Sequence, residues 1–130
     1  MVIVSGFLLD IFTLRNKQVT AMALWPFIIF RDQPSRNNVQ MLNHERIHHR
    51  QQLELLIVPF YIWYFIEYWT AMFRCGFKHH KAYMSISFEQ EAYAHQWDLN
   101  YLNKRKWLGS WPYFKAKFKQ DDHSKKNNQG

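Results

Sequence analysis

The chain has 130 residues and a single cysteine, Cys75, so no internal disulfide can form. A lone cysteine is typical of a reducing compartment, and the first ten residues lack the basic start and the cleavage site of a secretory signal. Acidic residues are also scarce, with 10 Asp and Glu against 17 Lys and Arg and a formal net charge of +7. We therefore expect a cytoplasmic protein whose surface attracts anionic partners.

The sequence also lacks a long, uninterrupted apolar run. The longest candidate, residues 55–73, contains Pro59 and Glu67. Its uncharged part, residues 55–66, is shorter than the roughly 20 residues that a membrane-spanning helix needs. We predict a buried or interfacial helix there. Trp and Tyr crowd its ends, as they do at membrane interfaces, so association with a membrane is the alternative interpretation.

The pattern of the remaining residues predicts an α+β fold that is mainly α. Residues 2–12 and 18–30 are rich in β-branched and aromatic residues and flank the polar stretch RNKQ, which predicts an N-terminal β-hairpin. Pro26 indicates that the second strand lies at a sheet edge or breaks there. Residues 31–38 have the composition of a loop.

Three main helices are predicted after the hairpin. The first is a helix of about 19 residues that begins at Val39, and the second covers residues 60–74. Residues 77–86 connect the second helix to the third. The third begins at a capping box, Ser87-Phe88-Glu89-Gln90, and is expected to continue to about Lys104.

The C-terminal part of the chain is basic and aromatic. Residues 103–119 mix Lys and Arg with Trp, Tyr and Phe, a composition that suits a helix end completing the core, a membrane surface or stacked nucleic-acid bases. Nucleic acid is the least expected of these partners, because no nucleic-acid-binding signature is present. We expect one domain over residues 1–118 and a disordered tail over residues 119–130.

The first predicted helix carries the motif His44-Glu45-Arg46-Ile47-His48. Residues four apart lie one above the other on a helix, so His44 and His48 present two imidazoles at a separation that a metal ion bridges. Glu45 is placed to take a proton from a water on that metal, which is why H-E-x-x-H on a helix supports zinc hydrolysis. The sequence therefore predicts a Zn²⁺ cofactor with Glu45 as the catalytic base.

Three further polar residues follow the motif on the same helix. His49 is turned away from the ligand face and is expected to be solvated or to donate a hydrogen bond. Gln51 lies seven residues after His44, on the ligand face, where it would orient a ligand, line the cleft or make a plain polar contact. Glu54 stands where one extended form of the motif has a third histidine, and it is expected to take no part.

A catalytic zinc site needs a third protein ligand. Glu89 is the preferred candidate, because it lies in the first turn of the third helix, where the helix dipole favours a carboxylate. Glu91 points about 200° around that helix, so only one of the two can ligate, and the other is expected to be a solvated surface acid. A histidine remains the alternative, and the available histidines are His79, His80 and His95.

With Glu89-Gln90-Glu91-Ala92, the motif resembles the gluzincin type of zincin-like metallopeptidases, which have H-E-x-x-H and a later E-x-x-A. The chain is similar to a group of small bacterial members that share NHERIHxRQQ, an apolar aromatic segment and AYxxISFExEAYA, over roughly residues 20–105. The resemblance implies a minimal zincin-like core and a zinc site of His44, His48 and Glu89, with Glu45 as general base and acid. It also implies that the segment AMALWPFIIF is an edge strand able to pair with an extended substrate.

One residue departs from the family pattern. Larger gluzincins often carry Asp four residues after the ligand Glu, and here that place is Tyr93, whose phenol can form a hydrogen bond but supplies no charge. Tyr83, His79 and His80 are further candidates to stabilise a transition state. We expect a zinc-dependent hydrolase, specifically a metallopeptidase acting on peptides or proteins. The alternative is a non-catalytic module that binds a membrane surface or nucleic acid and has a structural or incidental histidine cluster.

Overall fold

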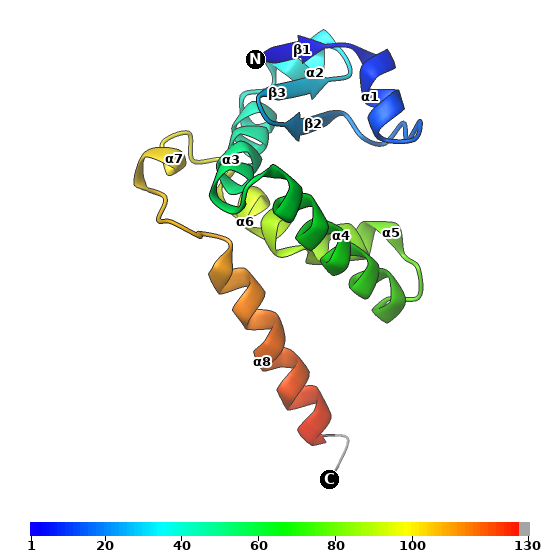
Figure 1. Ribbon diagram of the computed structural model, residues 1–130, viewed down its shortest axis with the longest axis vertical. Helices are drawn as coiled ribbons and strands as arrows, with labels where there is room; N and C mark the ends of the chain where they lie inside the picture. Colours follow the sequence, from blue (N-terminus) through cyan, green and yellow to red (C-terminus); the bar gives the residue numbers. More distant parts are fainter. Residues whose placement is uncertain (128–130) are drawn as a thin grey trace.

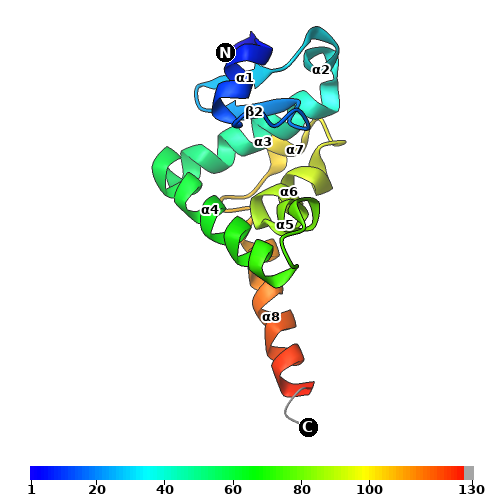
Figure 2. The same cartoon turned by 90° about the vertical axis from the view of Figure 1, so that its right-hand side faces the viewer.

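The computed structural model describes residues 1–127 and confirms an α+β fold that is mainly α, with a small sheet at the N-terminal end (Figure 1). The helices fill the middle of the molecule, and the last one projects away from it (Figures 1 and 2). The elements are β1 (Val2–Val4), α1 (Gly6–Phe12), β2 (Ala21–Leu24), β3 (Phe27–Phe30), α2 (Gln33–Asn37), α3 (Val39–Leu55), α4 (Ile57–Arg74), α5 (His79–Ser85), α6 (Ser87–His95), α7 (Tyr101–Lys104) and α8 (Trp111–Asn127).

The three strands are ordered β1-β3-β2, with β1 parallel and β2 antiparallel to β3. The predicted hairpin between residues 2–12 and 18–30 is therefore wrong. The chain leaves β1 at Ser5, whose hydroxyl accepts a hydrogen bond from the N–H of Leu8 and caps α1. The observed hairpin joins β2 to β3, and the predicted break at Pro26 is confirmed, because this residue lies in the turn between them.

Two segments predicted to be irregular contain short helices. Asp32 caps α2 by accepting a hydrogen bond from the N–H of Ser35, within the predicted loop 31–38. Helix α5 occupies most of the predicted connection 77–86. Helix α8 continues to Asn127 and so includes residues 119–127 of the segment for which a disordered tail was expected, and residues 128–130 lie outside the described part of the chain.

The first two of the three main helices are confirmed as α3 and α4, although α4 begins three residues early. They meet at Leu56, whose φ of 64° lies in the left-handed region, and their axes differ in direction by 111°. Among the described residues, no single helix is both long and apolar enough to cross a membrane. Within the same residues, the bent pair of α3 and α4 is the only combination that is long and apolar enough, judged by length and composition alone.

The predicted third helix differs in two ways. It ends at His95, and a separate turn of helix, α7, follows. The predicted capping box is wrong, because Ser87 lies inside the helix and its neighbour Ile86 is the N-cap residue. Instead, the carboxylate of Glu67 in α4 accepts hydrogen bonds from the N–H and the hydroxyl of Ser87, both at 2.6 Å. A buried acid from another helix thus satisfies the start of α6.

The core lies where α3, α4 and α6 meet and continues under the sheet. Phe60 of α4 packs with Ile86 and Phe88, and Trp63 and Tyr64 border this cluster. Ile47 of α3 and Ala92 of α6 are fully buried, and the small side chain of Ala92 permits a close approach of the two helices. This packing brings the motif helix α3 against the first turns of α6.

Candidate metal centre

Three buried side chains from two helices converge on one point: His44 and His48 of α3 and Glu89 of α6. The Nε2 atoms of the two histidines are 3.1 Å apart. One carboxylate oxygen of Glu89 lies 3.0 Å from Nε2 of His44, and the other lies 3.2 Å from Nε2 of His48. The structure thus brings together the three residues that were predicted as ligands. We call them the His-His-Glu cluster.

The spacing of these atoms suits a small metal ion. In a tetrahedral zinc site with bonds of about 2.0–2.1 Å, neighbouring ligand atoms are about 3.3 Å apart. The separation of the two Nε2 atoms, 3.1 Å, is slightly shorter than this edge, and each Nε2 atom has a different oxygen of Glu89 at a similar distance, 3.0 Å for His44 and 3.2 Å for His48. Three protein ligands leave one position of a tetrahedron open, which is the arrangement of catalytic zinc sites.

Two glutamines fix the orientation of the imidazole rings. Gln51 donates through Nε2 to a backbone carbonyl and, at 2.8 Å, to Glu91, so its amide oxygen faces Nδ1 of His48, also at 2.8 Å. The amide oxygen of Gln96 lies 3.0 Å from Nδ1 of His44. Because an amide oxygen only accepts, Nδ1 of each ring carries a proton, and Nε2 of each ring faces the cluster, where it offers a lone pair whenever it is not itself protonated.

The centre of the cluster consequently presents acceptors only, namely two imidazole lone pairs and a carboxylate. Buried acceptors that face one another repel unless a proton or a metal ion lies among them. Burial alone would lower the pKa of His48, but the charge of Glu89 and the hydrogen bond to it raise this pKa to about 9. Burial would raise the pKa of Glu89, yet His48 and His44 hold it well below its ordinary value. Both shifts indicate a point that favours a positive charge.

Glu45 is buried next to the cluster, at the interface of α3 with β2. Burial raises the pKa of its carboxyl, while the nearby histidines oppose that shift. The N–H of Ala23 donates a hydrogen bond to the carboxylate. A raised pKa brings a carboxyl closer to the working pH, which is the property of a general base that takes up and returns a proton.

Strand β2 is an edge strand, as expected, but side chains from two helices cover its middle. The carbonyl of Ala23 accepts hydrogen bonds from Gln52 at 2.9 Å and from Tyr61 at 2.7 Å, while its N–H is bonded to Glu45. An extended peptide could therefore pair with β2 at Ala23 only by displacing these groups. The implied role of this strand in substrate pairing does not fit the closed arrangement at that residue.

Sequence reasoning missed two side chains that contact the cluster. Tyr64 of α4 donates its hydroxyl proton to Glu89 at 2.8 Å, and burial together with the charge of Glu89 keeps its pKa well above the ordinary value. Tyr64 lies on a different helix from Glu89, so no residue spacing in the sequence indicates this contact. Gln96 had an available signal, since it follows Glu89 by seven residues, just as Gln51 follows His44.

Tyr93 makes a ring contact where the family pattern has a charged hydrogen bond. Its ring packs edge-on against His44, with centroids 4.5 Å apart, and Gln96 takes the hydrogen bond to this histidine. The hydroxyl of Tyr83 donates to Tyr93, and burial raises the pKa of both phenols. Both tyrosines therefore stay protonated at neutral pH, on the partly exposed side of the cluster.

The remaining histidines lie apart from the cluster. His49 is confirmed as a hydrogen-bonding residue, with Nε2 2.8 Å from the carbonyl of Phe27. His79 bonds to Tyr68, and His80 is exposed on the surface of α5. His95 stacks on a tyrosine ring at a centroid distance of 3.8 Å. Within the described residues, none of these histidines belongs to the His-His-Glu cluster.

The expectation that Glu91 is a solvated surface acid is wrong, because it is fully buried, whereas Glu54 takes no part in the His-His-Glu cluster, as expected. The side chains of both are shielded from water, and the guanidinium of Arg105 forms ion pairs with both. The hydroxyl of Tyr101 also donates to Glu91, at 2.8 Å. We call these four residues the Arg105 network. Gln51 joins it to the His-His-Glu cluster, because this one amide contacts both Glu91 and His48.

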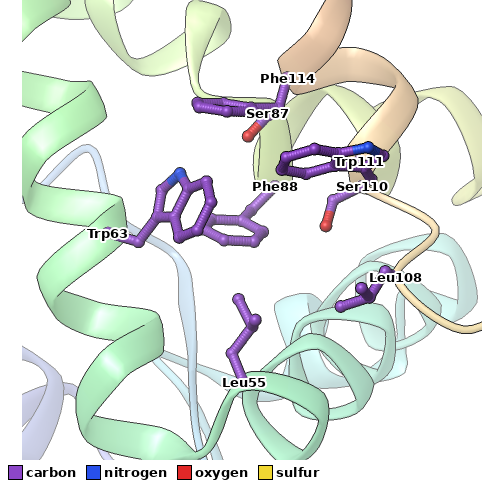
Figure 3. A pocket seen from close by; sticks show the side chains of 8 residues that line it. All are labelled: Leu55, Trp63, Ser87, Phe88, Leu108, Ser110, Trp111 and Phe114. Carbon is purple, nitrogen blue, oxygen red and sulfur yellow. The ribbon is translucent and has the colours of Figure 1, made fainter.

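A small apolar cavity of about 90 Å³ opens beyond Phe88, between α4, α6 and the start of α8 (Figure 3). Its walls are mostly aromatic and aliphatic side chains, and none of the predicted ligands lines it. The lining residues are Leu55, Trp63, Ser87, Phe88, Leu108, Ser110, Trp111 and Phe114. The cavity therefore belongs to the packing of α8 and not to the candidate metal centre.

Comparison of the chain with known protein families, with curated proteins and with solved structures finds no match. The resemblance to zincin-like metallopeptidases thus rests on the motif residues alone.

Proposed function

We propose that this protein is a zinc-dependent hydrolase that cleaves amide bonds in peptides or proteins. One observation carries the proposal: His44, His48 and Glu89 turn metal-ligating atoms toward one buried point, where the two Nε2 atoms are 3.1 Å apart and each lies 3.0–3.2 Å from an oxygen of Glu89. The H-E-x-x-H spacing on α3 and the resemblance to gluzincins support the same reaction class.

The residues around the cluster have distinct roles in this proposal. A zinc ion held by the three ligands supplies Lewis acidity toward a carbonyl group and a water molecule. Glu45 takes a proton from the attacking water and returns it to the leaving amine. Tyr93, which stays protonated and accepts a hydrogen bond from Tyr83, is the candidate donor to the developing oxyanion.

Three further side chains hold the ligands in place without touching substrate. Gln51 and Gln96 fix the ring orientation of His48 and His44, and Tyr64 does the same for the Glu89 carboxylate. Such hydrogen bonds to metal ligands set both their orientation and their basicity.

Metal content tests the first part of the proposal. The protein is purified without added metal, and zinc is measured by elemental analysis in the wild type, His48→Ala and His49→Ala. We expect about one zinc per chain in the wild type and in His49→Ala, and almost none in His48→Ala. His49 is the matched control, because it is the adjacent histidine and bonds only to the sheet. A wild type without zinc, or equal zinc in all three proteins, would reject the metal centre.

Hydrolysis tests the second part, with fluorescein-labelled casein and a pool of quenched fluorescent peptides as probes. Glu45→Gln keeps an oxygen acceptor for the N–H of Ala23, so we expect this variant to fold and to retain zinc. Its hydrolysis should fall by about 10²–10⁴-fold, because an amide cannot carry the proton. Full activity of Glu45→Gln contradicts the assigned role. A zinc-loaded wild type that cleaves neither probe favours the non-catalytic alternative, with a structural metal.

A further inference from the structure

Helix α4 has two apolar faces, and only one of them is packed. Its inner face carries Phe60 and Tyr64 into the core, against α5 and α6. The opposite face has six large apolar side chains at spacings of 4, 3, 1, 3 and 4 residues, each between 48% and 70% exposed. We call this surface the α4 outer face, and it consists of Val58, Ile62, Phe65, Ile66, Trp69 and Phe73.

The spacing places these side chains on one side of the helix, which lies on the outside of the molecule (Figures 1 and 2). The only hydroxyl within the stripe, that of Thr70, donates to the carbonyl of Ile66 at 2.6 Å. The hydroxyl of Thr70 therefore already has a hydrogen-bond partner within the helix. A stripe of six exposed, large apolar side chains on one helix face is unusual on a monomeric soluble protein and marks an interaction surface.

The exposed Lys and Arg residues between positions 57 and 81 are not accompanied by an exposed acid. Glu67 is the only acidic residue between positions 57 and 81. It is turned inward, where it accepts hydrogen bonds from Ser87 and forms an ion pair with Lys117. The C-terminal end of the stripe is followed by the exposed cations Lys78 and Lys81. An apolar face with a basic end, in a segment without an exposed acid between positions 57 and 81, is complementary to an anionic lipid surface.

The same charges disfavour a second copy of the chain as the occupant. Each copy has a formal charge of +7 and the same two exposed lysines beside its stripe, so two facing copies would repel each other. We propose that the α4 outer face binds in the plane of an anionic membrane, with its apolar side chains at the boundary of the acyl chains and its basic end among the headgroup phosphates.

An in-plane position fits the inner face better than a spanning one. Glu67 would enter the hydrocarbon region if α4 crossed the bilayer, and its bonds to Ser87 and Lys117 tie the helix to α6 and α8. When α4 lies flat, these bonds stay intact. Tyr64 also keeps its hydrogen bond to Glu89, because it leaves α4 on the core side. This binding does not depend on the proposed hydrolase activity.

The test is sedimentation of the full chain with phosphatidylcholine vesicles that contain or lack phosphatidylglycerol, at low and at high salt. The main variant combines Trp69→Ser and Phe73→Ser, and Ile62→Ser with Ile66→Ser is an independent second variant. The matched control combines Trp97→Ser and Leu99→Ser, which are 70% and 58% exposed. They lie in the connection before α7, on the opposite side of the molecule from α4 (Figure 1).

We expect the wild type and the control to bind the phosphatidylglycerol vesicles, and binding to weaken at high salt. The partition coefficient should fall by at least about tenfold in each α4 variant, because each loses apolar area from the buried stripe. Circular dichroism and zinc content should match the wild type, since all four substituted side chains are exposed. The result supports the proposal only if both α4 variants behave alike.

Three outcomes would overturn the proposal. The first is equal sedimentation of the wild type, the α4 variants and the control. The second is loss of binding in Trp107→Ser with no change in the α4 variants, which assigns the membrane contact to the basic, aromatic C-terminal segment. The third is a wild-type dimer in analytical ultracentrifugation that the α4 substitutions convert to a monomer without any lipid binding, which assigns the face to a second copy of the chain.

Discussion

The His-His-Glu cluster and the Arg105 network are two buried polar groups built on the same pair of helices. Each places side chains of α3 opposite side chains of α6, and each is almost fully shielded from water. The Arg105 network contains its own cation, since one guanidinium pairs with two carboxylates. The His-His-Glu cluster has one carboxylate and two imidazoles but no residue with a permanent positive charge.

Charge, and not burial, therefore separates the two groups. A guanidinium stays protonated at every relevant pH, so the Arg105 network is complete from the atoms of the chain alone. An imidazole accepts or releases a proton near neutral pH and binds metals through its lone pair. The cluster thus takes its cation from solution, either as a proton or as a metal ion. We infer that the network stabilises the fold and that the cluster performs the chemistry.

The largest expected effect on stability is that of Arg105→Met. This change leaves Glu54 and Glu91 buried without their cation, and we expect the free energy of unfolding in urea to fall by about 3–5 kcal/mol.

Lys117→Met is the matched control, because it also removes the cation from a buried carboxylate, that of Glu67. There, three donors remain: the N–H and hydroxyl of Ser87 and the indole of Trp63. We therefore expect a loss of no more than about 1 kcal/mol. Equal losses of unfolding free energy in the two variants would show that Arg105 contributes no more to stability than Lys117 does.

The pH dependence of the metal-free protein gives the second effect. The pKa of His48 is about 9 in the folded protein against an ordinary value of 6.5, so its contribution to stability is complete below pH 6.5 and is lost as the pH rises through 9. After chelation, the free energy of unfolding should fall by about 3 kcal/mol over this interval. With zinc bound, the ligand is already deprotonated, and this loss should disappear.

Urea titrations at several pH values, with and without zinc, measure this difference. His48→Ala is the control, because it lacks the titrating group and should lose the pH-dependent step in both conditions. A metal-free wild type whose stability is constant from pH 6.5 to about 9 would contradict the comparison, since the cluster would then hold no proton in place of the metal.

The identity of the three candidate ligands could be predicted from local patterns and from the family resemblance. His44 and His48 lie one above the other on any helix, and Glu89 was singled out because the start of a helix favours a carboxylate. The lengths of α3 and α4 followed equally from their composition. These predictions needed only the spacing of residues along a helix and the residue types at its ends, both of which can be read from the sequence.

The surroundings of the cluster depend on contacts between distant segments. The Arg105 network joins residues up to 51 positions apart, and no local pattern distinguishes its two buried acids from surface ones. Glu67 reaches Ser87 from 20 positions away and removes the need for a capping box. The hairpin was misplaced for a related reason: the hydroxyl of Ser5 caps a helix in the middle of a segment whose composition favours a strand.

The smallest expected effect concerns Gln51, the one residue that touches both groups. Gln51→Ala removes the acceptor that holds Nδ1–H of His48, so the ring is free to rotate and to change tautomer. We expect the affinity for zinc, measured by competition with a chromophoric chelator, to fall by about 10–100-fold.

Gln52→Ala is the matched control for this change. Gln52 is equally buried on the next position of α3, but its amide bonds to the carbonyl of Ala23 and to the N–H of Trp25 on the sheet side. Both variants lose a buried amide and its hydrogen bonds, so their losses of stability should be similar. Only Gln51→Ala should weaken zinc binding. Equal affinities in the two variants would mean that the ring orientation of His48 does not depend on the Arg105 network, and that the two polar groups are independent neighbours.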